Sequence, residues 1–350
     1  MWLDKYLKPY HYSLPKELIA QKPARPRDSA RLLVYRCKDG SIKFDTFENL
    51  GKYLPKNSVL VFNKTRVIPA RLALKKDTGG KVEILYLGAD VKKRVFKVLA
   101  NKKLSIGSSL SLLSNLKKVI RLRVIGKQEN VYLLKTNQTT GNLKKLFEKY
   151  GQTPLPPYLK NSRLNETARR KEYQTIFARA GESIAAPTAG LHFTKRLMNK
   201  LASKGFSLKF INLNVNLGTF APLKKENLMQ GKLHAENYSI DKKTARFIAH
   251  AKKQGRPVVA VGTTVTRALE SAYKNPRALK LKGNTKLFIR PPYKFKIVSA
   301  LVTNFHVPKS SLMMLVAALI GRKLLLNIYK KAVKKQFRFF SFGDGMLILP

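Results

Sequence analysis

The stretch VVAVGTTVTR, residues 258–267, is the clearest indication of the fold class. Its four consecutive apolar residues predict a strand buried on both faces, at residues 258–261. A glycine and two threonines follow directly, and helical spacing then predicts a helix at residues 264–273. A buried strand that feeds a helix through a short turn is the building unit of α/β proteins, so this stretch predicts an α/β fold.

The turn between this strand and helix is a candidate anion site. Gly262, Thr263 and Thr264 would place free backbone N–H groups and hydroxyls at a helix start, where a carboxylate or phosphate is favoured. Arg267 and Glu270 follow at helical spacing on one face. Ordinary capping by threonine, with an ion pair between Arg267 and Glu270 inside the helix, would explain the same residues, and this motif alone favours that structural explanation.

Helix and strand patterns alternate over most of the chain. Asp241 as an N-cap and Gly255 just past a helix end give the best-defined boundaries. Helices are predicted at residues 191–204, 241–253, 264–273 and 311–321, and strands at residues 32–36, 59–62, 208–215, 258–261, 286–289, 295–302 and 346–349. One sheet would therefore draw strands from both ends of the chain.

A middle segment has a different character. Six short β-branched runs recur there without a helix between them, at residues 71–74, 82–87, 95–100, 108–113, 119–125 and 131–135, followed by a helix at residues 142–149. This spacing predicts a small β-barrel or sandwich. We therefore expect an α/β main domain formed by residues 1–65 and 152–350, with residues 66–151 inserted as a β-domain.

The charge balance predicts a polyanionic partner. The 350 residues include 70 Lys+Arg and 19 Asp+Glu, a formal net charge of +51. Such a surface attracts nucleic acid at long range, with an anionic membrane surface as the other polyanion to consider. The single Cys37 excludes a disulfide framework and a multi-cysteine zinc site. The charged, proline-containing N-terminus and the short apolar runs predict a cytosolic protein without a membrane span.

A turn rich in small residues is a second candidate site. The sequence AAPTAGLHFT, residues 185–194, leads into the predicted helix 191–204. Gly190 permits a left-handed or crowded backbone, and small side chains around Thr188 let a ligand approach the main chain. His192 would lie at the helix start, where the helix dipole disfavours its protonated form. A neutral imidazole there could act as a general base, although a lone histidine is more often a structural hydrogen-bonding group.

A third candidate is the sequence TNFHVPKS, residues 303–310, which follows a strand and precedes a buried helix. Ligands of α/β proteins bind at this position. Asn304, His306, Lys309 and Ser310 bring four polar groups into the loop. A capped loop in which backbone groups satisfy His306 is the alternative.

The scarce carboxylates are candidates for acid catalysis. Glu236, Glu270 and Asp344 stand in stretches with little other charge. No metal-ligand spacing or Walker loop occurs, so neither a metal nor a nucleoside triphosphate is expected. The sequence RFFSFG, residues 338–343, interleaves aromatic rings with a cation and could stack nucleic-acid bases. A core strand would explain the same aromatic residues.

These segments, in this order, resemble the S-adenosylmethionine:tRNA ribosyltransferase-isomerase family of queuosine synthesis. The resemblance covers nearly the whole chain; each segment alone is modest evidence, but the ordered set is specific. The matching segments are YSLPKELIAQ (12–21), PRD (26–28) with Arg31, NKTRVIPAR (63–71), GGKVE (79–83), PLPPY (154–158), YQT (173–175), residues 185–194, GTF (218–220), VGTT (261–264) with Arg267 and Glu270, residues 303–310 and residues 338–344.

The resemblance implies an α/β domain with an inserted β-barrel and a specific reaction. The ribosyl part of S-adenosylmethionine would be transferred and isomerised onto an aminomethyl-deazaguanine at the wobble position of a tRNA with a GUN-type anticodon. Epoxyqueuosine would form, with adenine and methionine released. S-adenosylmethionine would thus be a co-substrate, with no metal required, and the protein a cytoplasmic monomer that does not bind membranes.

The resemblance also suggests roles for the candidate residues. A base must remove a proton next to the sulfonium, and His192 and His306 are the candidates; protonated Asp344 or Glu236 could assist departure of adenine. The donor-binding candidates are Thr188, Gly190, Gly262, Thr263, Thr264, Arg267 and Asn304, and the RNA-binding candidates are Arg66, Arg71 and Lys309.

Several positions depart from the family's usual pattern. Asn214 and Asn216 stand where the family usually has His and Gly. Gly231 stands in place of a His, Pro292 stands in place of a Gly, and Ser299 stands in place of an acidic residue. These departures motivate an alternative hypothesis: a catalytically impaired descendant that acts as a tRNA-binding protein.

Overall fold

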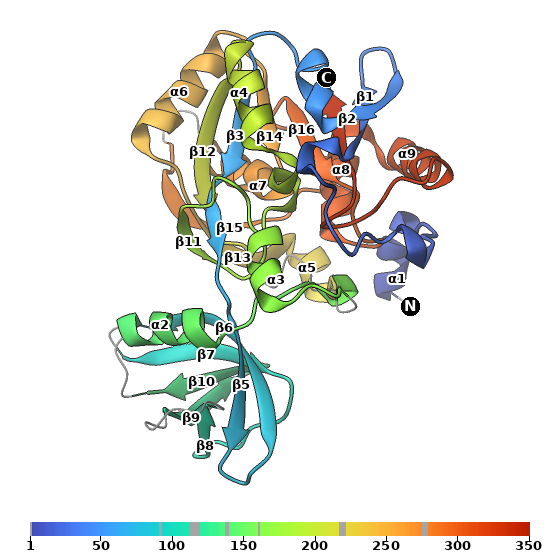
Figure 1. Cartoon of the computed structure of the whole chain (residues 1–350). Coiled ribbons are helices and arrows are strands. Elements are labelled where there is room, and N and C mark those ends of the chain that lie inside the picture. Colours follow the sequence, from blue (N-terminus) through green and yellow to red (C-terminus); the bar gives the residue numbers. More distant parts are fainter. Residues whose placement is uncertain are drawn as a thin grey trace. The chain divides into compact units, whose positions relative to one another are not determined.

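The computed structural model describes residues 2–90, 93–112, 120–136, 140–159, 162–216, 222–274 and 279–350. The chain divides into two compact units, coloured along the sequence in Figure 1. The α/β unit comprises Met1–Arg66, Pro156–Arg163 and Glu172–Pro350, and the barrel unit comprises Val67–Leu155 and Leu164–Lys171. The division into two domains with boundaries after residues 65 and 151 stays a prediction.

A nine-stranded sheet forms the centre of the α/β unit. Its strand order is β15 (Lys282–Leu287), β13 (Lys232–Ser239), β12 (Ser207–Leu213), β3 (Val59–Asn63), β14 (Val258–Val261), β16 (Ala300–Asn304), β17 (Gly345–Leu349), β1 (Arg31–Arg36) and β2 (Ile42–Thr46). The middle strands β12, β3, β14 and β16 are parallel. β3, β14, β16 and β17 are buried along their whole length, which explains their nearly uninterrupted apolar sequences. The predicted α/β fold is confirmed.

Helices pack on both faces of this sheet (Figure 1). The helices α6 (Lys242–Lys253), α7 (Thr263–Ala272), α8 (Ser311–Ile320) and α9 (Arg322–Lys334) share one core cluster with Val59 and Val61. The helix α4 (Lys195–Ser203) shares the other cluster with Leu60 and Phe62. Successive residues of β3 thus face opposite layers, as the pleat of a strand requires.

The barrel unit contains a closed, six-stranded antiparallel barrel. The order is β10 (Val131–Lys135), β7 (Val95–Ala100), β6 (Lys81–Asp90), β5 (Arg71–Lys76), β8 (Ser109–Leu112) and β9 (Arg121–Gln128). Alternate residues such as Leu72 and Leu74 are buried inside, and α2 (Thr140–Tyr150) adds Leu146 and Phe147 to the same core. A barrel is therefore formed rather than a sandwich. Residues 113 and 119 of the predicted strands lie outside the described residues.

Several element boundaries predicted from the sequence are wrong. The predicted helix 191–204 begins at Lys195, because Thr194 is the N-cap and accepts a hydrogen bond from the backbone N–H of Leu197. Residues Thr188–His192 form a separate 3₁₀ helix, η6. The predicted strand 295–302 begins at Ala300, and the predicted strand 286–289 corresponds to Lys282–Leu287.

The sequence patterns also missed whole elements. These are α1 (Trp2–Leu7), α3 (Glu166–Glu172), α5 (Lys225–Gln230), α9, β2, β4 (Thr65–Val67), β11 (Ala180–Ser183) and β13. Gly321 explains the missed α9, because this glycine ends α8 and is also the N-cap of α9. Among the described residues no single helix is long and apolar enough to cross a membrane; α8 and α9 pass that test only as a pair bent by 110°.

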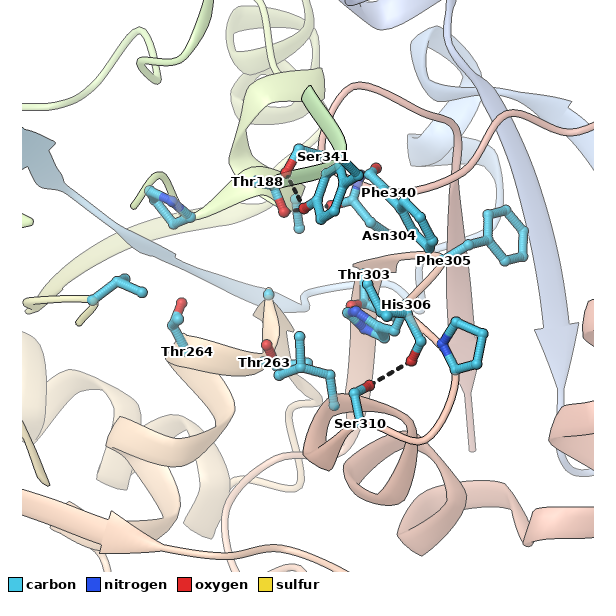
Figure 2. A pocket seen from close by; sticks show the side chains of 18 of the residues that line it. Thr188, Thr263, Thr264, Thr303, Asn304, Phe305, His306, Ser310, Phe340 and Ser341 are labelled. Atoms are coloured by element: carbon cyan, nitrogen blue, oxygen red, sulfur yellow. Dashed lines mark hydrogen bonds between the residues drawn. The ribbon is translucent and has the colours of Figure 1, made fainter. Parts of the chain in front are cut away.

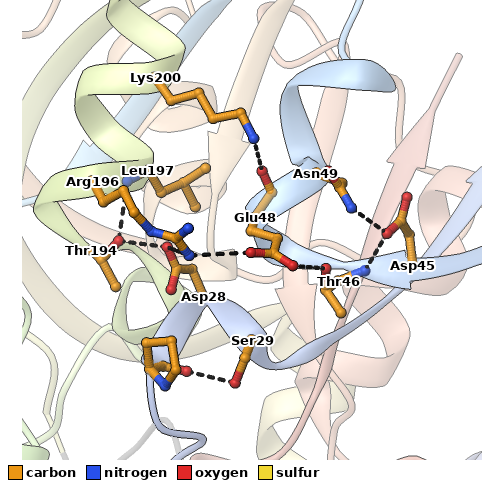
Figure 3. Close-up of polar contacts among 11 residues, drawn as sticks. Asp28, Ser29, Asp45, Thr46, Glu48, Asn49, Thr194, Arg196, Leu197 and Lys200 are labelled. Atoms are coloured by element: carbon orange, nitrogen blue, oxygen red, sulfur yellow. Dashed lines mark hydrogen bonds and ion pairs between the residues drawn. The ribbon is translucent and has the colours of Figure 1, made fainter.

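A buried carboxylate fixes the segment that leads into α4 (Figure 3). Asp28 accepts hydrogen bonds from the hydroxyl of Thr194 at 2.7 Å and from Nη2 of Arg196 at 3.0 Å. Arg196 also reaches the carboxylate of Glu48 at 3.2 Å. The N-terminal segment therefore holds the start of α4, and with it the η6 turn just before.

Candidate functional site

A cavity of about 470 Å³ lies at the carboxyl ends of β14 and β16 (Figure 2). Three of the segments singled out in the sequence meet there: residues 186–189, the start of α7, and residues 303–310. Most of the lining is apolar, and the polar groups come chiefly from threonine, serine, Asn304 and His306. An apolar cavity with a few placed polar groups at strand ends is typical of a small-molecule site in an α/β protein.

Asn304 joins two walls of the cavity. Its Oδ1 accepts a hydrogen bond from the hydroxyl of Thr188 at 3.0 Å. Its Nδ2 donates to the carbonyl oxygen of Phe340 at 3.1 Å and lies 3.1 Å from Nε2 of His192. Both amide donors are therefore used, and Asn304 fixes the shape of the wall.

Gly190 lies behind this wall and does not line the cavity. A Cβ atom at this position would approach side-chain atoms of Phe177 and Thr175 to 3.0 Å. The backbone is therefore crowded rather than left-handed, and the glycine allows η6 to pack tightly.

His306 lines the cavity and is held at three points. Its Nε2 lies 2.8 Å from the hydroxyl of Thr303. Its carbonyl oxygen accepts a hydrogen bond from Tyr12 at 2.6 Å, and its backbone N–H donates to the hydroxyl of Tyr329 at 2.8 Å. Burial lowers the pKa of His306 to about 3, so the imidazole is neutral at pH 7.

His192 is buried behind Asn304 rather than in the cavity wall. Its ring stacks on Phe47 with centroids 4.0 Å apart and an interplanar angle of 9°. Burial, with the charges of Arg338 and Arg27, lowers the pKa of His192 to about 3. The expected neutral form is thus present, but not because of a helix dipole, since α4 begins only at Lys195.

The first turn of α7 contributes Thr263 and Thr264 to the cavity. Gly262 precedes them with φ of 101°, a conformation that favours glycine. The hydroxyl oxygen of Thr264 is buried and has no hydrogen-bond partner among the described residues. Leaving such a group unsatisfied costs on the order of 1–3 kcal/mol, so this hydroxyl is available to a ligand.

Arg267 and Glu236 lie outside the cavity and pair with each other. Their ion pair is buried between α7 and β13, and Arg267 also donates to the carbonyl oxygen of Leu287 at 3.0 Å. Glu270 accepts hydrogen bonds from the backbone N–H groups of Ile297 and Val298 at 3.1 and 3.0 Å. The interpretation of Arg267 and Glu270 as an intrahelical ion pair is therefore wrong.

Asp344 is also buried and also outside the cavity. Its Oδ1 accepts from the backbone N–H of Arg31 at 3.0 Å, and its Oδ2 from that of Arg338 at 2.8 Å. Nη2 of Arg338 also donates to Oδ1 of Asp344 at 3.2 Å. In the same stretch Phe339 and Phe342 are buried in the core, whereas Phe340 lines the cavity. Phe339 and Phe342 thus serve packing, and the stretch does not form the core strand considered from the sequence.

The RNA-binding candidates occupy separate places. Lys309 lines the cavity, with its Nζ 4.0 Å from a carboxylate oxygen of Asp4. Arg66 is exposed on β4 of the α/β unit. Arg71 belongs to the barrel unit, where it forms an ion pair with Glu83.

The departures at Asn214 and Asn216 do not alter the cavity lining. Only Val215, between them, lines the cavity, because successive side chains of an extended segment point to opposite sides. Asn214 accepts hydrogen bonds from the hydroxyl of Thr65 at 3.3 Å and from Nδ2 of Asn212 at 3.0 Å. Asn216 donates to the carbonyl oxygen of residue 235 at 3.0 Å.

The other departures are also away from the cavity lining. Gly231 ends α5 with φ of 61°, and no atom lies within 4 Å of a Cβ built on it. Ser299 accepts a hydrogen bond from the backbone N–H of Val258 at 3.4 Å, and neither Ser299 nor Pro292 lines the cavity. The GTF segment, residues 218–220, lies outside the described residues.

Sequence reasoning gave no role to four residues that shape the site. Tyr158 and Ser341 line the cavity and share a hydrogen bond of 2.8 Å. Tyr12 and Tyr329 hold the backbone of His306. Three of them lie in matched segments, but only the fold brings these segments together. Within the described ranges no group of three or more His, Cys, Asp or Glu side chains could hold a metal.

These features define an α/β protein with an inserted closed barrel and a small-molecule cavity at the ends of its parallel strands. A sequence model described as "Queuosine biosynthesis protein" matches residues 7–348. The chain therefore belongs to the queuosine biosynthesis protein family.

Relatives support this membership. A Fusobacterium nucleatum protein named S-adenosylmethionine:tRNA ribosyltransferase-isomerase is 45% identical over 99% of this chain and 97% of its own length. An Aquifex aeolicus protein of the same name is 45% identical over 98% of this chain and 99% of its own. The crystal structure of S-adenosylmethionine tRNA ribosyltransferase from Thermotoga maritima covers 97% of this chain and 100% of that one, with 34% identity and a TM-score of 0.56.

Proposed function

We propose that this protein transfers and isomerises the ribosyl part of S-adenosylmethionine onto an aminomethyl-deazaguanine at the wobble position of a tRNA with a GUN-type anticodon. The products are epoxyqueuosine in the tRNA, adenine and methionine. Family membership and the printed names of the relatives support the class of reaction. The observation that carries the proposal to this chain is the polar lining of the cavity, which includes Thr188, Asn304 and His306.

The cavity suits S-adenosylmethionine in size and chemistry. A volume of about 470 Å³ falls in the range of small-molecule sites, and its largely apolar walls can cover a purine and the aliphatic part of a methionine chain. The unpartnered hydroxyl of Thr264 and the free N–H groups of the first turn of α7 fit the methionine carboxylate. Thr263 and Lys309 extend the polar side of the same cavity.

His306 is the proposed base. The sulfonium of the donor acidifies the adjacent carbon, and the imidazole of His306 lies in the cavity wall, where it can accept the proton that leaves. Tyr12 and Tyr329 fix the backbone of His306, so its ring is held for this role. Asn304 and His192 shape the wall beside the donor rather than transferring the proton.

Release of free adenine tests the proposal. The purified protein is incubated with S-adenosylmethionine and a queuosine-accepting tRNA that carries the aminomethyl precursor, and adenine and the modified nucleoside are followed by chromatography. Both products are expected together. A folded sample that binds the donor and the tRNA but releases no adenine contradicts the proposal.

The second candidate is a tRNA-binding protein without catalysis. The replaced residues Asn214, Asn216 and Gly231 motivate it, but their side chains do not line the cavity, which favours the active enzyme. Calorimetric titration with S-adenosylmethionine separates the candidates. The active enzyme binds the donor at one site, whereas the impaired descendant shows salt-sensitive tRNA binding and no donor binding.

A further inference from the structure

A second hollow of the α/β unit lies beside α9, outside the cavity described above. It is a groove of about 600 Å³ between residues 11–13 and one face of α9. Lys323, Asn327, Lys330 and Lys334 line the α9 side. Their spacing of four, three and four residues places all four in one stripe along the helix.

This stripe carries uncompensated positive charge. No aspartate or glutamate occurs in the sequence between Glu270 and Asp344. Lys323, Lys330 and Lys334 are exposed and form no ion pair within the described part of the chain. Helix geometry puts the Cα atoms of Lys330 and Lys334 about 6 Å apart along the axis, and those of Lys323 and Lys330 about 10 Å. A row of cations at such intervals suits a chain of phosphates better than a single anion.

Hydrogen bonds link the walls of the groove to the wall of the cavity. Tyr12 lines the groove, and its hydroxyl donates to the carbonyl oxygen of His306 in the cavity wall at 2.6 Å. Tyr329, on the buried side of α9, accepts from the backbone N–H of His306 at 2.8 Å. A polyanion in the groove therefore runs along an element that contacts the proposed base.

We infer that the groove between residues 11–13 and α9 binds the phosphodiester backbone of the substrate RNA next to the cavity, an inference that rests on the proposed function. The half-buried Leu326 and Val333 provide an apolar floor for the sugars, and Lys323, Lys330 and Lys334 contact the phosphates. An anionic membrane is the less suitable partner, because the apolar face of α9 is packed in the core through Leu325 and is not free to insert.

The test compares two triple variants that remove the same charge. The groove variant is Lys323→Gln/Lys330→Gln/Lys334→Gln, and the control is Lys242→Gln/Lys243→Gln/Lys253→Gln. The control residues are exposed lysines of α6, which packs on β12 and β14 away from α9 (Figure 1). All six side chains are exposed, so both variants are expected to fold.

The groove variant is expected to raise the Kd for tRNA about tenfold or more near 0.15 M salt, and to reduce the slope of log affinity against log salt by roughly two to three. The control variant should change Kd by less than about threefold. Adenine release at saturating tRNA should stay within about twofold of the wild type in both variants, because neither set of lysines lines the cavity.

Equal losses of tRNA affinity in the two variants would overturn the inference, because they would indicate general attraction by a basic surface. Unchanged tRNA binding, with lost binding to phosphatidylserine vesicles, would overturn it in favour of a membrane. A third outcome separates the two proposals. If the wild-type protein releases no adenine, and tRNA affinity falls in the groove variant but not in the control variant, the proposed function is refuted and the groove is supported as an RNA-binding site.

Discussion

The side-chain amide of Asn304 donates a hydrogen bond to Nε2 of His192 across 3.1 Å. The carbonyl oxygen of Phe340 can only accept, so it fixes which end of the amide carries hydrogen. Nε2 of His192 is therefore unprotonated, and the ring proton is on Nδ1. Of the two buried histidines, His306 lines the cavity whereas His192 lies behind Asn304, which makes His306 the candidate to take a proton from a ligand.

Asn304→Asp tests this arrangement. At pH 8 the buried carboxylate would replace the amide group that donates to the carbonyl oxygen of Phe340, so two acceptors would face each other, and we expect a loss of about 2–4 kcal/mol in the free energy of unfolding. At pH 5 a proton on either ring or carboxylate restores one contact, and the loss should be smaller. Urea unfolding at both pH values measures this loss.

Thr188→Ala is the control, because it removes one hydrogen bond of Asn304 without adding a charge. It should cost about 1 kcal/mol at both pH values. Equal losses for Asn304→Asp at the two pH values would contradict the burial of a charged carboxylate against the carbonyl oxygen of Phe340.

The two buried histidines should make the protein sensitive to acid. The pKa values of His192 and His306 are lowered from 6.5 to about 3 in the folded state. Between these values the unfolded chain binds more protons than the folded chain, so stability falls as the pH falls through this window. Within this window each histidine lowers the free energy of unfolding by about 1.4 kcal/mol for each pH unit of acidification. Urea midpoints at pH 7, 6 and 5 should decrease, and His306→Asn should flatten the decrease. Parallel pH profiles for variant and wild type would refute the burial argument.

The ion pair of Glu236 and Arg267 is expected to be structural. Glu236→Gln leaves the buried guanidinium without its carboxylate and should cost about 3–5 kcal/mol. Glu236→Leu combined with Arg267→Met should recover most of that loss, because an apolar pair of similar size avoids burying charge. The double variant should still release adenine. A stable double variant without adenine release would instead assign Glu236 or Arg267 to the chemistry.

His306→Ala should abolish turnover and leave tRNA affinity nearly intact. Loss of a general base typically costs 10²–10⁴ in rate. Single-turnover adenine release and tRNA binding by fluorescence anisotropy measure the two quantities separately. Equal losses in both would indicate that His306 is needed for the fold rather than for proton transfer.

Tyr329→Phe should lower kcat by about threefold to tenfold without changing the KM for tRNA. The variant removes the hydroxyl that accepts from the backbone N–H of His306, so the ring is held less firmly. Tyr273→Phe is the matched control, because its buried hydroxyl donates to the carbonyl of Ala245 outside the cavity. Both variants should cost about 1 kcal/mol of stability. A similar loss of kcat in both would argue against positioning by Tyr329.

Much of the α/β unit could be predicted from local sequence. Consecutive apolar residues at 258–261 predict a buried strand because both faces of β14 are covered by helices. The strand-end segments at 262–264 and 303–310 could be predicted for the same reason, since parallel strands bring their carboxyl ends to one edge. The missed α9 shows the limit of local signals: Gly321 indicates a helix end, and nothing nearby indicates that the next helix begins at once.

The partners of single side chains could not be predicted. Arg267 and Glu270 have the spacing of an intrahelical pair, yet Glu236 lies on a strand that the sequence did not reveal, and it takes the guanidinium. His192 and His306 are equally plausible bases in the sequence, and only the fold shows that His306 lines the cavity while His192 lies behind Asn304. Such choices depend on contacts between residues more than 30 positions apart, which no local pattern encodes.

The position of β17 also constrains how the protein is made. This strand lies between β16 and β1, and it is synthesised after every other strand of the sheet. A nascent chain that has not yet released residues 345–349 from the ribosome keeps two unpaired strand edges, both rich in apolar residues. The sheet therefore closes only after translation has passed these residues, whereas the barrel strands at residues 71–135 can pair much earlier.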